Sequence, residues 1–275
     1  MDISLGVTSG GPTVVGSVLR SSQSYLELLS RKQTLECGIA FYCEQFPRLA
    51  DGNQFREVLV ESTEQAAASL SRVLRFFDEH NLVCSSWALA EGQQPESVEP
   101  VLTEAGYVRE DNVVMALTAW PKGIPASDVR VLPARPMRKV FHEVCTQAAD
   151  FHPAEEREVV VEAANERLDD HRIDAQVATV DKQAAGTCTL FHVGDVGRLV
   201  DLYVARTYRR CGVATALLHH LIAIARRVTM RVVCIKIPAG NAGAIEMLKT
   251  MDFVEAGRTV EFRHRDMPRP DYSNW

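Results

Sequence analysis

The sequence lacks the features that mark several large classes of protein. Its 275 residues include seven cysteines, an odd number, and no two of them form a Cys-x-x-Cys pair. This pattern argues against a disulfide framework and against a zinc site, and it favours a reducing compartment. No charged segment followed by an apolar core opens the chain, so we expect no secretory signal. No apolar run approaches the roughly 18 residues that a membrane span needs. We therefore expect a soluble, cytoplasmic protein that binds no membrane.

Basic charge is also scarce, and the deficit is uneven. Lys and Arg total 30 against 36 Asp and Glu, which gives a net charge of -6 and argues against a nucleic-acid partner. Residues 1–120 hold 8 basic and 16 acidic side chains, whereas residues 121–275 hold 22 and 20. If the acidic part overhangs a substrate site, its charge favours a cationic substrate. The alternative is an ordinary solvated face.

The chain length and one short segment predict two domains. At roughly 150 residues per domain, the length suggests two, although one large domain is an alternative. Residues 121–127 contain two prolines and a glycine between apolar segments, so we place a linker there. The sequence then predicts an N-terminal domain at residues 1–120 and a C-terminal domain at residues 128–275.

Hydrophobic periodicity predicts helices and strands in both parts, and therefore a mixed α/β fold. In the first part we expect helices at 12–32, 63–79 and 95–105, with strands at 38–43, 83–89 and 112–119. In the second part we expect helices at 137–151, 154–168, 215–227 and 242–251, with strands at 129–132, 175–180, 186–192, 198–204, 231–237 and 258–263.

The turn after the expected strand 198–204 carries the strongest chemical signal. Arg206, Arg209 and Arg210 precede a helix whose start contains the small residues Gly212 and Ala214. The first N–H groups of a helix lack internal partners and carry the positive end of its dipole. Small residues let a pyrophosphate approach these groups closely. The segment thus predicts a diphosphate site, with a helix start and solvated arginines as the alternative. Neither a Walker A motif nor G-x-G-x-x-G is present.

Two motifs in the second part resemble a known family. Arg-x-x-Gly-x-Ala at residues 209–214 resembles the Q/R-x-x-G-x-G/A signature of the GNAT superfamily of acyl-CoA N-acyltransferases. Asn-x-x-Ala-x-x-Met-Leu at residues 241–248, followed by Asp-Phe, is similar to the family's N-x-x-A-x-x-L-Y…G-F block. The resemblance covers roughly residues 128–265. It implies a mixed, mostly antiparallel sheet with helices on both faces, and two neighbouring strands that splay apart around acetyl-CoA.

The resemblance also implies a reaction and a set of binding residues. Acetyl-CoA, as co-substrate, would give its acetyl group directly to a primary amine of a small molecule or peptide, while both are bound. Backbone amides of Tyr203 and Val204 would meet the pantetheine arm and the thioester. Asn241 would contact the same arm, and a helix-capping role is its alternative. The pyrophosphate would lie on amides of Arg209, Arg210, Cys211, Gly212, Val213, Ala214 and Thr215. No metal is implied.

Candidate catalytic residues follow from the same resemblance. Asp201, on the expected strand 198–204, corresponds to a carboxylate or water relay of many family members, and a strand-edge hydrogen-bonding role is its alternative. The family's usual general acid is a tyrosine in the Asn-x-x-Ala block, where this sequence has Leu248. Tyr203 and Tyr208 are nearby substitutes. Because of Leu248, a non-catalytic acyl-CoA-binding regulatory module remains the alternative function.

The first part of the chain has no such phosphate-binding turn. The order of its expected elements nevertheless resembles a smaller, degenerate GNAT half, and Gly106-Tyr107 corresponds to Asp252-Phe253 near the end of the second part. An unrelated α/β extension is the alternative. In both cases we expect this part to shape the acceptor site or an interface and not to bind CoA.

Overall fold

The computed structural model describes residues 13–123 and 128–268. The start of the expected first helix, Pro12, and residues 124–127 of the expected linker lie outside the described residues. The helices are α1 (Val14–Leu26), α2 (Thr63–Glu79), α3 (Glu99–Glu104), α4 (Arg138–Ala148), α5 (Ala154–Arg167), α6 (Val213–Arg227) and α7 (Ala242–Lys249).

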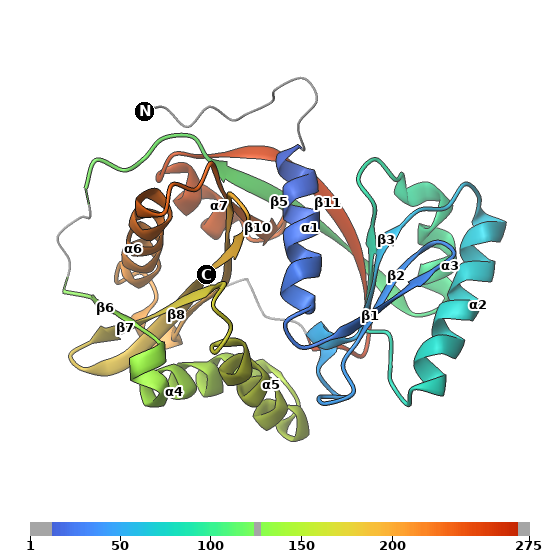
Figure 1. The fold of residues 1–275 in the computed structure, drawn as a ribbon, viewed down its shortest axis with the longest axis horizontal. Helices are drawn as coiled ribbons and strands as arrows, with labels where there is room; N and C mark the ends of the chain where they lie inside the picture. The colour runs from blue at the N-terminus through green and yellow to red at the C-terminus, as the bar shows by residue number, and fades with distance from the viewer. Residues whose placement is uncertain (1–12, 124–127, 269–275) are drawn as a thin grey trace.

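One continuous sheet runs through both parts of the chain (Figure 1). Its order is β1-β2-β3-β4-β11-β5-β10-β9-β8-β7-β6, and only the β3–β4 and β9–β10 pairs are parallel. The mixed, mostly antiparallel sheet is therefore confirmed. The strands are β1 (Arg31–Leu35), β2 (Gly38–Tyr42), β3 (Gln54–Val58), β4 (Ser86–Leu89), β5 (Tyr107–Leu117), β6 (Arg130–Pro133), β7 (Ile173–Val180), β8 (Gln183–Val193), β9 (Val196–Val204), β10 (Val232–Pro238) and β11 (Phe253–His264).

The last strands of the two parts are exchanged at the centre of this sheet. We call the elements from α1 to β5 the N-terminal half and those from β6 to β11 the C-terminal half. Strand β5 closes the N-terminal half, yet it pairs with β10 of the C-terminal half. Strand β11 closes the C-terminal half, yet it pairs with β4 of the N-terminal half. The two long strands also pair with each other, from Phe253 opposite Leu117 to His264 opposite Tyr107. Each half thus completes the sheet of the other.

Helices cover both faces of the C-terminal half, as expected. On one face α6 and α7 pack on the strands, with Leu217 and Leu248 fully buried in the largest core cluster. On the other face α4 and α5 form a second cluster that includes Phe191. Helix α1 belongs to the N-terminal half, but it contacts β8, β9, β10 and β11. Its Val18 is buried against Cys234 of β10. Figure 1 shows α1 at the centre, between the two halves.

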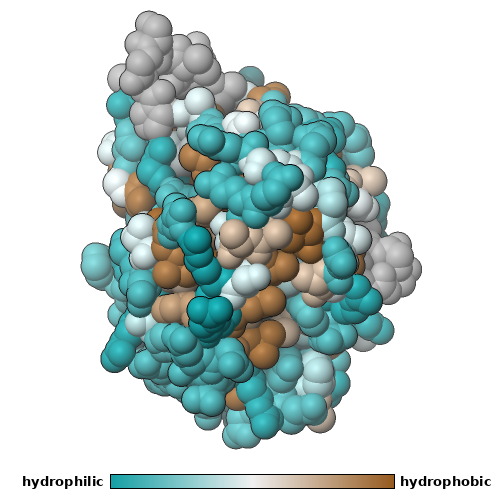
Figure 2. All heavy atoms as spheres, turned by 90° about the vertical axis from the view of Figure 1, so that its right-hand side faces the viewer, coloured by the Kyte–Doolittle hydropathy of each residue, from teal (hydrophilic) through white to brown (hydrophobic). Residues whose placement is uncertain are grey.

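The N-terminal half has its own hydrophobic core, formed by residues of its strands and of helices α2 and α3. Phe55 of β3, Phe77 of α2 and Trp87 of β4 are nearly inaccessible to solvent there. The outer side of this half is mostly hydrophilic, with hydrophobic side chains gathered in the middle of the view (Figure 2). Large exposed hydrophobic residues of this half include Leu59 and Val83. Neither lines the cavities described below.

Several sequence expectations for the N-terminal half are wrong. The first helix ends at Leu26, not at residue 32, and residues 31–35 form the edge strand β1. Strand β1 is almost wholly exposed, so it shows no apolar alternation. Strand β3 was not expected because it contains Gln54 and Arg56, although both are buried. The helix expected at 95–105 is a 3-10 turn followed by the short α3. In the C-terminal half, the hairpin loop is shorter than expected because β8 begins at Gln183.

Candidate functional site

The two parallel strands β9 and β10 diverge halfway along their length. They pair from Val196 opposite Val232 to Leu199 opposite Ile235, and no further. Beyond Leu199, β9 continues to Val204 along β8 alone. The edge of β9 that faces β10 is thereby opened, which is the splay that the sequence resemblance implies.

A β-bulge lies on β9 directly after the point of divergence. Thr189 of β8 is opposite Val200, but Thr187 is opposite Tyr203, so β9 carries one extra residue. Asp201 lies in this bulge with a φ of 53°. This left-handed conformation is uncommon for residues other than glycine, though Asp tolerates it better than most. The bulge directs the exposed side chain of Asp201 into a large cavity.

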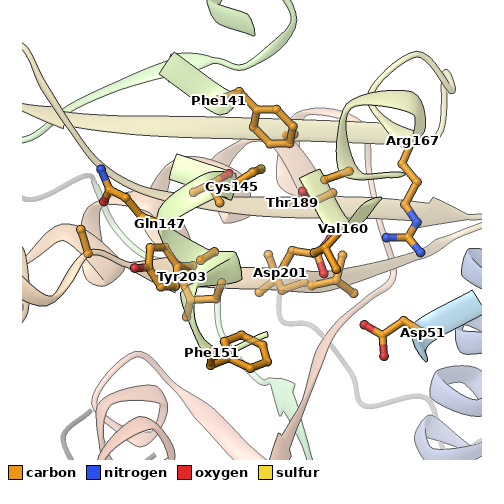
Figure 3. Close-up of a pocket in the computed structure, with 18 of the residues that line it drawn as sticks. Asp51, Phe141, Cys145, Gln147, Phe151, Val160, Arg167, Thr189, Asp201 and Tyr203 are labelled. Atoms are coloured by element: carbon orange, nitrogen blue, oxygen red, sulfur yellow. The ribbon is translucent and has the colours of Figure 1, made fainter. Parts of the chain in front are cut away.

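This acceptor-side cavity has a volume of about 640 Å³ and is formed by both halves of the chain. Its wall includes β9, α4 and α5 of the C-terminal half, and Tyr25 and Asp51 of the N-terminal half. Arg167, Asp51 and Asp201 lie toward one end in Figure 3, and Tyr203 and Gln147 lie toward the other. The N-terminal half therefore contributes side chains to this cavity.

A second cavity, the phosphate-side cavity, lies between the turn after β9, the start of α6, and α7. Its volume is about 540 Å³. It is lined by six of the predicted phosphate-binding residues, Arg209, Arg210, Gly212, Val213, Ala214 and Thr215, and also by Val204. Cys211 does not line it, and its side chain is exposed. Leu202, Arg209 and Ala244 line both cavities, so the two spaces meet at the splay.

The start of α6 is left open by the local sequence. Gly212 is the N-cap residue, with a φ of 79° and no side chain to cap the helix. The first helical hydrogen bond runs from the N–H of Ala216 to the carbonyl of Gly212, at 2.9 Å. The N–H groups of residues 213–215 precede this bond, so the helix itself offers them no partner. Arg209 is held beside them because its Nε donates to the carbonyl of Val204 at 3.3 Å. Backbone donors and a fixed positive charge thus converge on the phosphate-side cavity.

Asp201 is engaged by a residue that the sequence did not reveal. The hydroxyl group of Tyr25, on α1, donates a hydrogen bond to Oδ2 of Asp201. Burial, followed by the nearby charge of Asp201, raises the pKa of Tyr25 well above its ordinary value, so this phenol stays protonated. The guanidinium carbon of Arg167 lies 4.9 Å from the centre of the Tyr25 ring. Tyr25, Arg167 and Asp201 form one contiguous group in the acceptor-side cavity.

Four charged side chains are buried where the halves meet. Glu261 of β11 binds Arg56 of β3 at 3.1 Å and Lys236 of β10 at 2.6 Å, so it joins the two halves. Burial alone would raise the pKa of Glu261, but Lys236 and Arg56 hold it well below the ordinary value. Burial lowers the pKa of Lys236 to about 8, because the charge of Glu261 opposes the burial only in part and the positive charges of Arg56 and Arg198 lower the pKa further. Two cations share one carboxylate, and Lys236 also lines the acceptor-side cavity.

The remaining predicted site residues have distinct positions. Tyr203 is half-buried in the wall of the acceptor-side cavity, and burial raises the pKa of its phenol. Asn241 caps α7, because its Oδ1 accepts from the N–H of Ala244 at 3.1 Å, and it also lines this cavity. Tyr208 lines the phosphate-side cavity. Leu248 is fully buried in the core, so the position of the family's usual acid faces away from both cavities.

Sequence reasoning missed the residues that come from outside the two motifs. Tyr25, Asp51 and Arg167 line the acceptor-side cavity, and none belongs to a recognisable pattern. The contact between Tyr25 and Asp201 spans 176 positions of the chain. No local spacing signals such a contact, since it depends on α1 crossing onto the strands of the other half.

Residues 13–123 and 128–268 show neither a metal-binding cluster nor a membrane-spanning helix. In that part of the chain, no group of three or more His, Cys, Asp or Glu side chains is placed to hold a metal ion. No helix there is long and apolar enough to span a membrane. All seven cysteines are free thiols, and six of them are buried.

Comparison with protein families gives one match. Residues 138–253 match the sequence profile of the Acetyltransferase (GNAT) family. This range contains β9, its bulge, the turn after it, α6 and α7, and therefore both motifs on which the sequence resemblance rests. No curated protein matches the chain significantly.

Solved structures share the fold of nearly the whole chain. A functionally unknown conserved protein from Staphylococcus epidermidis is 13% identical with a TM-score of 0.70, covering 86% of this chain and 95% of that one. A GCN5-related N-acetyltransferase from Kribbella flavida is 12% identical with a TM-score of 0.63, covering 94% and 98%. A tandem GNAT protein from the clavulanic acid biosynthesis pathway is 14% identical with a TM-score of 0.53, covering 85% and 80%. At these identities the likeness concerns the fold.

Proposed function

Residues 138–253 belong to the GNAT superfamily of acyl-CoA N-acyltransferases, and from this premise we propose that the protein transfers an acetyl group from acetyl-CoA to a primary amine. The observation that carries the proposal is the divergence of β9 and β10 beyond Leu199, with a cavity on either side of β9. One cavity offers phosphate-binding groups and the other offers charged side chains from both halves. Two ligands can therefore be bound at once, with their reacting ends at the splay.

Acetyl-CoA fits the phosphate-side cavity. The free N–H groups at the start of α6 would hold its pyrophosphate, and Arg209 and Arg210 would add positive charge. The pantetheine arm would lie along the open edge of β9 at Tyr203 and Val204, where an extended chain can replace the missing strand partner. Asn241 caps α7 and lines the acceptor-side cavity, which meets the phosphate-side cavity at the splay, so it would contact the pantetheine arm there. We place the activity in the cytoplasm, which the seven free thiols favour.

The reaction is a direct transfer in a ternary complex. The amine nitrogen attacks the carbonyl carbon of the thioester, a new C–N bond forms, and the C–S bond breaks to release CoA. Holding both reactants at the splay supplies much of the rate enhancement. A backbone N–H near Val204 would stabilise the negative charge that develops on the carbonyl oxygen. The acceptor ammonium group must lose one proton to become the nucleophilic amine, and its nitrogen loses a second proton when the amide forms; one of these two protons ends on the departing sulfur and the other in solvent.

Asp201 and Tyr203 are the candidate catalytic residues. The carboxylate of Asp201 lies in the acceptor-side cavity directly after the splay, where it would take the proton of the ammonium group, directly or through a water molecule. Tyr203 lines the acceptor-side cavity on the same strand as Asp201, and it keeps its proton because burial raises its pKa. It would protonate the departing thiolate. Leu248 can do neither, because its side chain is in the core.

The alternative function is a non-catalytic acyl-CoA-binding regulatory module. Two observations favour it: Leu248 replaces the usual acid, and the hydroxyl of Tyr25 already occupies one oxygen of Asp201. Tyr25 binds Oδ2 of Asp201, which leaves Oδ1 to accept a proton, and the side chain is exposed to the cavity. These two observations favour the enzyme.

Release of free CoA distinguishes these two functions. The purified protein is given acetyl-CoA and a panel of primary amines, and the thiol released is measured against a reaction without acceptor. Turnover that depends on the acceptor is the expected result. Tight binding of acetyl-CoA by calorimetry, with no thiol released for any amine, would establish the regulatory module instead.

A further inference from the structure

Arg167 lacks the partner that a guanidinium group in its position requires. It is the last residue of α5, and its side chain extends into the acceptor-side cavity toward Asp51 (Figure 3). Its Nε is buried and has no hydrogen-bond partner. Within residues 13–123 and 128–268, the side chain makes no ion pair, and its guanidinium group lies over the ring of Tyr25.

A buried and unpaired polar group carries a desolvation cost, so a partner is expected when the site is in use. Burial alone would lower the pKa of Arg167, but Tyr25, Asp201 and Asp51 outweigh it and raise the pKa. The guanidinium group is thus always charged. Asp51 and Asp201 act on it through space, but neither carboxylate forms an ion pair with it. A guanidinium group presents paired N–H donors whose geometry matches a carboxylate.

The charges around Arg167 restrict the anion that fits. Asp51 and Asp201 lie toward the same end of the cavity and would repel a doubly charged phosphate (Figure 3). They would instead attract an ammonium group placed beside a single carboxylate. Lys236, which shares Glu261 with Arg56, adds further positive charge to the cavity wall. The wall of this cavity therefore carries both cationic and anionic side chains, which match the two charges of a zwitterionic ligand.

We infer that the acceptor is an amine that also carries a carboxylate, an amino-acid-like molecule whose carboxylate binds Arg167 and whose ammonium group faces Asp201. The inference rests on the proposed function and names its substrate class. Arg167 is a specificity-determining residue in this arrangement, since it touches the acceptor at a group that does not react. The ring of Tyr25 holds its guanidinium in place and also binds Asp201, so one side chain sets the spacing between the two recognition points.

The test compares acceptors that differ only in the carboxylate. Six amino acids of varied side chain are each assayed beside their carboxamide and their decarboxylated amine, with CoA release as the readout. In the wild-type protein we expect kcat/KM to be about 10- to 100-fold higher for the carboxylates, as befits one charge-assisted bidentate contact. In Arg167→Gln this preference should disappear, through a rise in KM for the carboxylates alone.

The matched control is Arg226→Gln. Arg226 also lies in the last turn of a helix, α6, but it is exposed and lines neither cavity. Its replacement should leave the preference unchanged. Activity of Arg167→Gln toward the carboxamides serves as the internal measure of folding, and acetyl-CoA binding at the distant α6 start is a second.

Each outcome has a separate meaning. Turnover of amines with no preference for the carboxylate, or a preference that survives in Arg167→Gln, would overturn the inference and leave the proposed function standing. Absence of turnover for every acceptor, despite acetyl-CoA binding, would overturn both.

Discussion

Each half contains a unit made of a strand, a helix and a second strand parallel to the first, and the two units differ in detail. In the N-terminal half, β3 leads through a short turn into α2, and the next strand, β4, runs parallel to β3. In the C-terminal half, β9 leads through a turn into α6, and β10 runs parallel to β9. Both first strands contain an irregularity with an acidic residue at positive φ, Glu57 at 54° and Asp201 at 53°. We propose that the N-terminal half is a degenerate GNAT-like copy of the C-terminal one.

The helix starts of these two units differ most in chemistry. The start of α2 is closed by its own side chains: Ser62 Oγ accepts from the N–H of Gln65 at 3.2 Å, and Gln65 Oε1 accepts from the N–H of Glu61 at 2.6 Å. Glu64 adds a negative charge in the first turn. This reciprocal capping occupies the donors that an anion would use. The start of α6 has Gly212 and no side-chain cap, so its donors stay available.

The parallel strand pairs differ as well. Strands β3 and β4 remain paired to Val58 and Leu89, and the rings of Phe55 and Trp87 pack 4.7 Å apart beside them. Strands β9 and β10 separate after Leu199. The two units therefore differ in two features: α6 has an uncapped start whereas α2 is capped, and β9 and β10 separate whereas β3 and β4 stay paired. Four predictions test this comparison, from the largest effect to the smallest.

Gly212→Glu should abolish acetyl-CoA binding, with a loss of affinity above about 100-fold. The new carboxylate would occupy the donors at the start of α6 and repel the pyrophosphate, and a positive φ adds strain for any residue but glycine. No other atom lies within 4 Å of the added Cβ, so the fold should survive. Calorimetry with acetyl-CoA measures the effect, and Ser62→Asp at the start of α2 is the matched control, expected to bind normally. Wild-type affinity in the Gly212 variant would refute the cofactor assignment.

Glu261→Gln should destabilise the whole molecule by about 3 kcal/mol, because it leaves Arg56 and Lys236 without their shared carboxylate. The melting temperature should fall by roughly 6–10 °C in one transition. The pKa of Glu261 is held below its ordinary value, so its contribution is full above about pH 5 and is lost as the pH falls below about 4. The difference between variant and wild type should shrink over that acidic range. Separate melting of the two halves would contradict the joining role of Glu261.

Asp201→Asn should lower kcat by about 100-fold and alter the pH–rate profile, since the amide cannot accept the proton. Asparagine tolerates the left-handed conformation, so the bulge should be kept. Glu57→Gln changes the corresponding acid of the N-terminal half and should leave kcat as it is. An Asp201 variant with an unaltered pH–rate profile would exclude this residue as the base.

Tyr25→Phe should lower kcat/KM by about two- to fivefold. The ring that supports Arg167 is kept, but Asp201 loses the hydrogen bond that holds one of its carboxylate oxygens. Steady-state kinetics of CoA release measures the effect. The control is Gln23→Leu, because Gln23 of the same helix donates to Glu57 at 2.6 Å. Equal effects of the two substitutions would mean that α1 acts only as a structural support.

Some features followed from the sequence because their causes are local. Helix α2 was predicted at its observed bounds, since Ser62 caps it and its apolar residues recur at helical spacing. The open start of α6 followed from Gly212 and the arginines around it. Strand β3 was missed because the burial of Arg56 is made possible by Glu261, more than 200 residues away. Tyr25 was missed for the same reason, since its role depends on Asp201 in the other half.

The exchange of β5 and β11 has a consequence for how this protein forms. Neither half can complete its own sheet from its own residues. One neighbour of β10 is β5 of the N-terminal half, and one neighbour of β4 is β11 of the C-terminal half. Contacts between such distant segments carry a high cost of loop closure and form late in folding. The N-terminal half can therefore complete its sheet only after β11, the last strand, has left the ribosome. We expect the halves, expressed separately, to be insoluble or unfolded alone and to regain structure only when they are mixed.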